Sequence, residues 1–444
     1  MSPQPSPPPS SPSESAGRSA LAPLRHPAFR ALAAGRGISL IGNGVAPMAL
    51  AFAVLGLTRS VSDLGLVVGS RSLFNVLFLL FGGVLADRLP RHLVLVGSGL
   101  MSAATQAAVA TLVLTHHATM PLLMALSAAN GVFAALALPA SSALVPQTVP
   151  AELRQSANAL NRMAANSSQI LGASLGGILV AAVGPGWGLA VDATSFAVSA
   201  LFFLRVRIPA AGAAGADGPA AAVVKRPGLV SELRDGWTEF ASRTWVWMIV
   251  GAFGFINAAY AGAVQILGPS VAVRTFGSAG WGFVLASQTA GMVVGGLLAL
   301  RIRPRRLLLV GVACMAGSAL TPLGLGFQVP VYALALAGFV GGLCAEQFGV
   351  AWETSLQQEI PQAKLARVYS YDMLGSFVAI PVAQVATGPL TQALGSRATL
   401  FGAAGVIVAG TAAMVSVPDV RRLRARRAEP VAEPEPVGVA DATA

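Results

Sequence analysis

The chain is a succession of long apolar stretches separated by short polar loops. An uncharged stretch of about 20 residues crosses a bilayer as a helix, and twelve such stretches fit between Ala31 and Val417. The pattern therefore predicts an all-α integral membrane protein with twelve transmembrane helices. Pro139 interrupts the fourth of them, and Pro381 interrupts the eleventh. The expected spans are Ala31–Leu55, Leu64–Leu85, His92–Leu114, Met120–Leu144, Ala159–Val183, Gly188–Leu204, Val246–Leu267, Trp281–Leu300, Leu307–Phe327, Val331–Trp352, Tyr369–Leu390 and Ala398–Val417.

The segments outside the spans are short and polar. Residues 1–23 are rich in proline and serine, and residues 419–444 mix basic and acidic positions, so both are expected to be disordered tails. Residues 206–243 form an Ala/Gly-rich linker ending in an amphipathic helix, with Leu229, Leu233, Trp237 and Phe240 on one face. With 55% hydrophobic and 11% charged residues, the chain has no room for a large soluble catalytic domain.

The basic residues give the expected orientation. The net charge is +11, and arginine and lysine are retained on the cytoplasmic side of a membrane protein. If both termini are cytoplasmic, the outer loops hold only Arg59, Arg274 and Arg397. The basic residues thus set the orientation of the protein in the cell membrane and contact anionic lipids, and we do not expect them to bind nucleic acid.

The two halves of the chain are copies of each other. Residues 82–86 (GGVLA) match residues 295–299 (GGLLA) at an offset of 213, and Asn43 matches Asn257 at 214. Residues 24–205 and 244–418 are therefore two six-helix halves related by pseudo-symmetry. A parallel repeat of six spans is the plan of a secondary transporter, whose substrate site lies where the halves meet near the midplane.

The loop after the second span resembles the signature of the major facilitator superfamily. Residues 83–92 read GVLADRLPRH, in which Gly83, Asp87, Arg88 and Arg91 fit the pattern, while proline replaces a glycine and His92 a basic residue. The resemblance implies alternating access by rocking of the halves. It also implies that Asp87 meets the positive end of the eleventh helix as a conformational latch when the cytoplasmic side is closed; an ordinary tight loop with topology charges is the alternative.

Shorter segments resemble the third drug:proton antiporter family, which includes macrolide and siderophore exporters. They are residues 24–30 (LRHPAFR), Gly42-Asn43, residues 191–196 (VDATSF) and the amphipathic helix before the seventh span. The chain departs from many proton-coupled drug exporters in its fourth span, where their arginine is absent. Ser127 lies near that position, and Asn130 precedes Gly131.

Few charged residues lie deep within the spans, and each should face a cavity or a partner. Glu346 in the tenth span is our first candidate for a carboxylate that carries a proton, and Asp192 in the sixth is the second. Arg71 lies at a depth similar to that of Asp192, so the two could pair, or each could reach the outer interface. Glu346 could equally be a carboxylate that hydrogen bonds neutralise.

By resemblance, spans one, four, seven and ten line the central cavity. A mostly apolar cavity with amides suits an amphipathic, neutral or cationic molecule. Each amide could equally make a hydrogen bond between helices. The candidate cavity residues are Asn43, Asn130, Asn257, Tyr260, Gln265 and Gln347.

The sequence thus predicts a transporter that exports a lipophilic small molecule, such as a drug, an antibiotic or a siderophore-like compound, by proton antiport. An importer or facilitator of a metabolite is the alternative. The chain has no phosphate-binding loop for ATP, and it lacks the clustered Asp, His or Cys side chains of a membrane enzyme. We expect a monomer with no metal and no cofactor.

Overall fold

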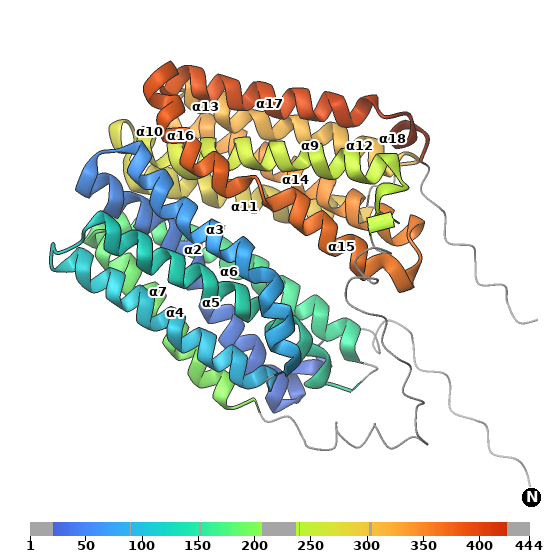
Figure 1. Ribbon diagram of the computed structural model, residues 1–444, viewed down its shortest axis with the longest axis horizontal. Coiled ribbons are helices and arrows are strands. Elements are labelled where there is room, and N and C mark those ends of the chain that lie inside the picture. Colours follow the sequence, from blue (N-terminus) through green and yellow to red (C-terminus); the bar gives the residue numbers. More distant parts are fainter. Residues whose placement is uncertain are drawn as a thin grey trace, which may run out of the picture.

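The computed structural model describes residues 21–88, 90–150, 153–206, 237–238, 240–301 and 304–423, and these residues form helices and no strands. The helices make two bundles, one from each half of the chain (Figure 1). The first bundle follows the short helix η1 (Ala22–Arg25) and includes η2 (Val145–Gln147) between its fourth and fifth long helices. Its long helices are α2 (Pro27–Thr58), α3 (Val61–Arg88), α4 (Arg91–Leu114), α5 (Met120–Leu144), α6 (Arg154–Val183) and α7 (Pro185–Leu204).

The second bundle has six membrane-length segments, three of them built from shorter pieces. The seventh segment joins α9 (Thr244–Tyr260), the π-helical η5 (Ala261–Leu267) and α10 (Gly268–Arg274). The ninth joins α12 (Leu307–Cys314), η6 (Met315–Ala319) and α13 (Leu320–Phe327), and the eleventh joins α15 (Gln362–Phe377) and α16 (Ile380–Leu394). The continuous helices are α11 (Gly277–Arg301), α14 (Val331–Glu359) and α17 (Ser396–Ser416).

The arrangement confirms the expected all-helical membrane fold. Within the described residues, eleven helices are long and apolar enough to cross a bilayer. The expected fifth span, α6, has 30 residues but a polar first half that includes Arg154, Asn158 and Asn161. It packs between α2 of its own bundle and α11 of the other, so protein rather than lipid surrounds much of it.

The two prolines behave differently. The fourth helix, α5, runs from Met120 to Leu144 without a break at Pro139. The eleventh segment is broken at Val378 and Ala379, and Pro381 lies in the first turn of α16, where its missing N–H costs no helical hydrogen bond.

The chain beyond the last span departs from expectation. We expected residues 419–444 to be disordered, but Pro418–Arg422 forms a short helix, α18. The reason is Val420, which is fully buried in the core of the second bundle. Most of the amphipathic helix lies outside the described residues, although the rings of Trp237 and Phe240 both contact Tyr371 of α15.

The two bundles touch mainly at one end. We call the end where α2 begins and α17 ends the terminal end, and the opposite end the far end. Near the far end, α16 packs along α3 so closely that a Cβ on Gly65 would lie 2.3 Å from the carbonyl oxygen of Gln384. There, Gln392 also donates a hydrogen bond to Ser62 at 3.0 Å. Toward the terminal end, α15 packs instead on α9 of its own bundle.

Candidate functional site

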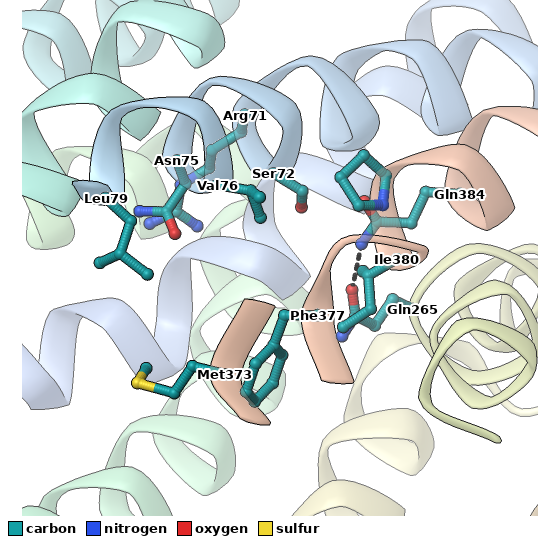
Figure 2. A pocket seen from close by; sticks show the side chains of 11 residues that line it. Arg71, Ser72, Asn75, Val76, Leu79, Gln265, Met373, Phe377, Ile380 and Gln384 are labelled. Atoms are coloured by element: carbon teal, nitrogen blue, oxygen red, sulfur yellow. Dashed lines mark hydrogen bonds between the residues drawn. The ribbon is translucent and has the colours of Figure 1, made fainter. Parts of the chain in front are cut away.

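A cavity of about 390 Å³ lies between the two bundles (Figure 2). One wall is α3 of the first bundle, and the other is formed by η5, α15 and α16 of the second. Its floor toward the far end is the close packing of α3 against α16. The lining residues are Arg71, Ser72, Asn75, Val76, Leu79, Gln265, Met373, Phe377, Ile380, Pro381 and Gln384.

The α3 wall presents polar groups one helical turn apart. Arg71 and Asn75 are four residues apart, so they share a face of the helix. Asn75 donates from Nδ2 to the carbonyl oxygen of Gly131 on α5 at 3.2 Å. Gly131 permits this contact, because a Cβ there would lie 2.2 Å from the carbonyl oxygen of Arg71. The close packing of α3 on α5 therefore holds both polar side chains at the cavity.

The guanidinium of Arg71 turns from the cavity into the first bundle. Its Nε donates to Asn130 Oδ1 at 3.1 Å, and a terminal nitrogen donates to Asn43 Oδ1 at 3.4 Å. Asn130 in turn donates from Nδ2 to Thr105 Oγ1 at 3.2 Å. Arg71 is thus partly exposed at the cavity and hydrogen-bonded to α2 and α5 behind it.

A buried carboxylate lies beyond this network. Asp192 of α7 is 0% exposed, and Oδ2 accepts a hydrogen bond from the amide of Gln106, the residue after Thr105 on α4. The opposite charges of Asp192 and Arg71 attract each other. The second oxygen of Asp192, Oδ1, has no hydrogen-bond partner among the described residues. It faces α2, where a Cβ on Gly42 would lie 2.6 Å from it. A buried carboxylate with a vacant acceptor is a suitable place for a proton.

The opposite wall of the cavity combines amides with apolar surface. Gln384 donates from Nε2 to Gln265 Oε1 at 2.6 Å, and Gln384 itself is 1% exposed (Figure 2). Phe377, Met373 and Ile380 add an aromatic ring and apolar groups around this pair. Such a wall can bind a molecule that has both a ring surface and hydrogen-bonding groups.

The remaining candidate residues lie apart from this cavity. Asn257 donates to the carbonyl oxygen of Ser376 at 3.1 Å, which ties α9 to α15. Gln347 donates to the carbonyl oxygen of Gly295, which ties α14 to α11. Glu346 is partly buried at the same helix pair, where a Cβ on Gly296 would lie 3.7 Å from its Oε1. Tyr260 packs against the core of the second bundle.

Comparison with known proteins identifies the family. The family model described as Major Facilitator Superfamily matches residues 32–379. The chain belongs to this superfamily. It is therefore a multi-pass membrane transporter and not an enzyme.

Two curated relatives of this chain share one description. The enterobactin exporter EntS of Citrobacter koseri is 26% identical over 422 residues, covering 90% of this chain and 94% of the relative. The enterobactin exporter EntS of Salmonella typhimurium is 27% identical over 425 residues, with the same coverage of 90% and 94%.

Solved structures of the superfamily share the fold at lower identity. The nucleoside transporter NupG is 14% identical with a TM-score of 0.68, covering 88% of this chain and 98% of that one. The D-xylose-proton symporter is 15% identical with a TM-score of 0.66, also covering 88% and 98%. A bacterial homologue of the iron transporter ferroportin, in its inward-facing state, is 15% identical with a TM-score of 0.66 and covers 87% and 98%.

The superfamily resemblance predicted a cavity lined by spans one, four, seven and ten, whereas the second and eleventh spans form most of the observed cavity. Of the six candidate cavity residues only Gln265 lines it, while Asn43 and Asn130 hold Arg71 from behind. Spacing could have found the missed residues, since Met373, Phe377, Ile380 and Gln384 recur at helical intervals. Nothing in the sequence pointed to Gln106 as the partner of Asp192. The side chains of the latch residues Gly83, Asp87, Arg88 and Arg91 lie outside those that the structure describes.

Proposed function

We propose that this protein exports an amphipathic aromatic small molecule of the siderophore class across the plasma membrane in exchange for protons. The position of Arg71 is the observation that carries the proposal. It lines the cavity between the bundles, and its hydrogen bonds through Asn130 end at Thr105 of α4. The next residue of α4, Gln106, donates a hydrogen bond to the buried Asp192, whose charge attracts that of Arg71. A change in the charge of Asp192 therefore changes the electrostatic potential at the wall of the substrate cavity.

The charges account for an exchange of proton and substrate. When Asp192 is ionised, it compensates Arg71, and the cavity wall accepts a neutral or cationic amphipathic molecule. When Asp192 is protonated, Arg71 is an uncompensated charge that holds hydration water beside the cavity. Displacing that water costs free energy, so a neutral or cationic amphipathic molecule binds less well. The protein then binds either the proton or the substrate but not both at once, which is the requirement for antiport.

The expected topology gives the direction. Arg305, Arg306, Arg421 and Arg422 lie at the terminal end, and the positive-inside rule assigns that end to the cytoplasm, together with both chain termini. The bundles pack together at the far end and separate toward the terminal end, so this conformation is the one that loads substrate from the cytoplasm. The curated relatives are described as exporters of enterobactin, which supports a siderophore as the substrate class.

Transport in membrane vesicles tests the proposal. Inverted vesicles from cells that lack their own siderophore exporter should accumulate enterobactin when the vesicle interior is acidified and this chain is present. Vesicles with Asp192→Asn should not accumulate it. Accumulation in right-side-out vesicles alone would establish the alternative, an importer. A panel of antibiotics and other siderophores, run in the same vesicles, would establish the substrate range.

A further inference from the structure

A second cavity, of about 250 Å³, is lined only by residues of the first bundle, and half of these residues are polar or charged. Helices α2, α4, α5 and α7 form its walls, and we call it the serine cavity. Its polar lining is dominated by five hydroxyl side chains. They are Ser39, Ser98, Ser102, Ser141 and Ser199.

The serine cavity points toward Asp192. Ser102 precedes Gln106 by one turn of α4, and Ser199 follows Asp192 by about two turns of α7. Asn43, which lines the cavity, accepts a hydrogen bond from Arg71 and follows Gly42, the residue that Asp192 Oδ1 faces. Three helices therefore bring the inner end of the cavity to the same layer as the buried carboxylate.

The opposite end of the cavity approaches the terminal end of the bundle. Ser141 lies three residues before the end of α5, and Phe203 lies one residue before the end of α7. Ser98 lies seven residues after the start of α4, or about 10 Å at 1.5 Å per residue. The serine hydroxyls thus extend from the terminal end to the middle of the bundle.

Two buried polar atoms in this region lack partners. Ser199 is 1% exposed and lines the cavity, yet its Oγ makes no hydrogen bond with any residue that the structure describes. Asp192 Oδ1, in the layer at the inner end, also makes none. Buried polar groups of this kind are normally satisfied by internal water. Since a water molecule occupies about 30 Å³ of liquid, the cavity has room for several.

The charges around the cavity are few. Arg36 of α2 lines it, and Arg71 of α3 faces its inner end through Asn43. Helix α5 contains no ionisable residue, α7 contains only Asp192, and α4 has only Arg91 and His92 at its terminal end. The remaining charged side chains of α2, α3 and α6 are Arg30, Asp63, Asp87, Arg88, Arg154 and Arg162. The charge of Arg36 disfavours a resident metal cation, so water is the occupant that fits.

We propose that the serine cavity is a water-filled route through which protons pass between Asp192 and the cytoplasm, separate from the substrate cavity between the bundles. The proposal rests on the proton coupling proposed above. In the conformation described here, substrate enters between the bundles while the proton leaves through the first bundle alone. The two therefore need not share one path.

Cysteine labelling tests whether the cavity contains water. In a background in which Cys314 and Cys344 are replaced by alanine, Ser102→Cys faces the cavity, while Met101→Cys has the same depth on the exposed outer surface of α4. Methanethiosulfonates react with the thiolate, which forms only where the thiol is hydrated. We expect a small neutral methanethiosulfonate to modify Ser102→Cys at least ten times faster than Met101→Cys. Equal rates would overturn the route, whatever the result for Asp192.

A matched pair of variants tests whether the water carries protons. Valine and threonine have similar shapes, but only threonine has a hydroxyl. We expect Ser102→Val to slow proton-driven enterobactin accumulation in inverted vesicles at least five-fold and Ser102→Thr to keep most of it, with enterobactin binding to the purified protein unchanged in both. Equal transport by the two variants would overturn the route. Full transport by Asp192→Asn would instead overturn the coupling role, while the labelling result would still report on the water.

Discussion

Arg71 donates a hydrogen bond to Asn130 at 3.1 Å, which brings a guanidinium from α3 to the middle of α5. Many proton-coupled drug exporters carry an arginine in the fourth span itself, and this chain does not. The contact places the guanidinium of a neighbouring helix beside α5. It also explains why Asn130 is 2% exposed and serves as a support for Arg71 rather than as part of the cavity wall.

The charge argument predicts how substrate binding depends on pH. Protonation of Asp192 leaves Arg71 uncompensated, so enterobactin binding to the wild-type protein should weaken as the pH falls. Asp192→Asn is neutral at every pH, and its binding should be weak throughout, by about ten-fold, which corresponds to about 1.4 kcal/mol. Isothermal titration of the purified protein at several pH values measures both. A pH-dependent affinity in Asp192→Asn would contradict the assignment.

Glu346 provides the comparison for coupling. It lies at the packing of α14 on α11 and not in the cavity between the bundles. We therefore expect Glu346→Gln to retain proton-driven transport within about two-fold, while Asp192→Asn loses it. The measurement is enterobactin accumulation in acid-loaded inverted vesicles. The opposite pattern would return the coupling role to Glu346, our first candidate from the sequence.

Replacing Arg71 should lower the stability of the fold, because it leaves the buried charge of Asp192 without a compensating cation. Removing one partner of a buried charge pair costs about 3–5 kcal/mol in a dry interior, and less is expected here because Arg71 is partly exposed at the cavity. Arg71→Gln should lower the melting temperature in detergent, and the double variant with Asp192→Asn should recover most of the loss. An additive effect of the two substitutions would show that the charges are not coupled.

Gly65 of α3 should control the closed end of the transporter. A Cβ on Gly65 would lie 2.3 Å from the carbonyl oxygen of Gln384, whereas a Cβ on Gly56 of α2 would have no described atom within 4 Å. We expect Gly65→Val to separate the bundles at the far end and to reduce transport at least ten-fold, with Gly56→Ala as a control near the wild-type rate. Cross-linking of Ser62→Cys to Gln392→Cys reports the separation. Undiminished cross-linking in Gly65→Val would contradict this role of Gly65.

The latch remains a prediction from the sequence motif. Asp87→Asn should leave membrane insertion intact and slow transport, because the contact with the start of the eleventh segment stabilises closure of the cytoplasmic side. Surface expression and the rate of enterobactin accumulation test this together. An unchanged rate would refute the latch.

Length and periodicity were sufficient to predict the helices and the division into halves, because a bilayer requires long apolar helices and repeats preserve their order. The cavity could be predicted less well. The amides at Asn43, Asn130 and Asn257 occupy equivalent depths by sequence, yet the first two hold Arg71 and the third bonds the backbone of Ser376. Side-chain partners depend on helix rotation and glycine contacts, which hydropathy does not encode.

The break at Val378 and Ala379 divides the eleventh segment between two neighbours. On one side of it, α16 is packed tightly on α3 of the other bundle, and on the other side α15 follows α9 of its own bundle. A continuous helix would transmit any tilt of one part to the other. We therefore expect the interruption to let α15 tilt toward or away from the first bundle independently of the packing of α16 on α3.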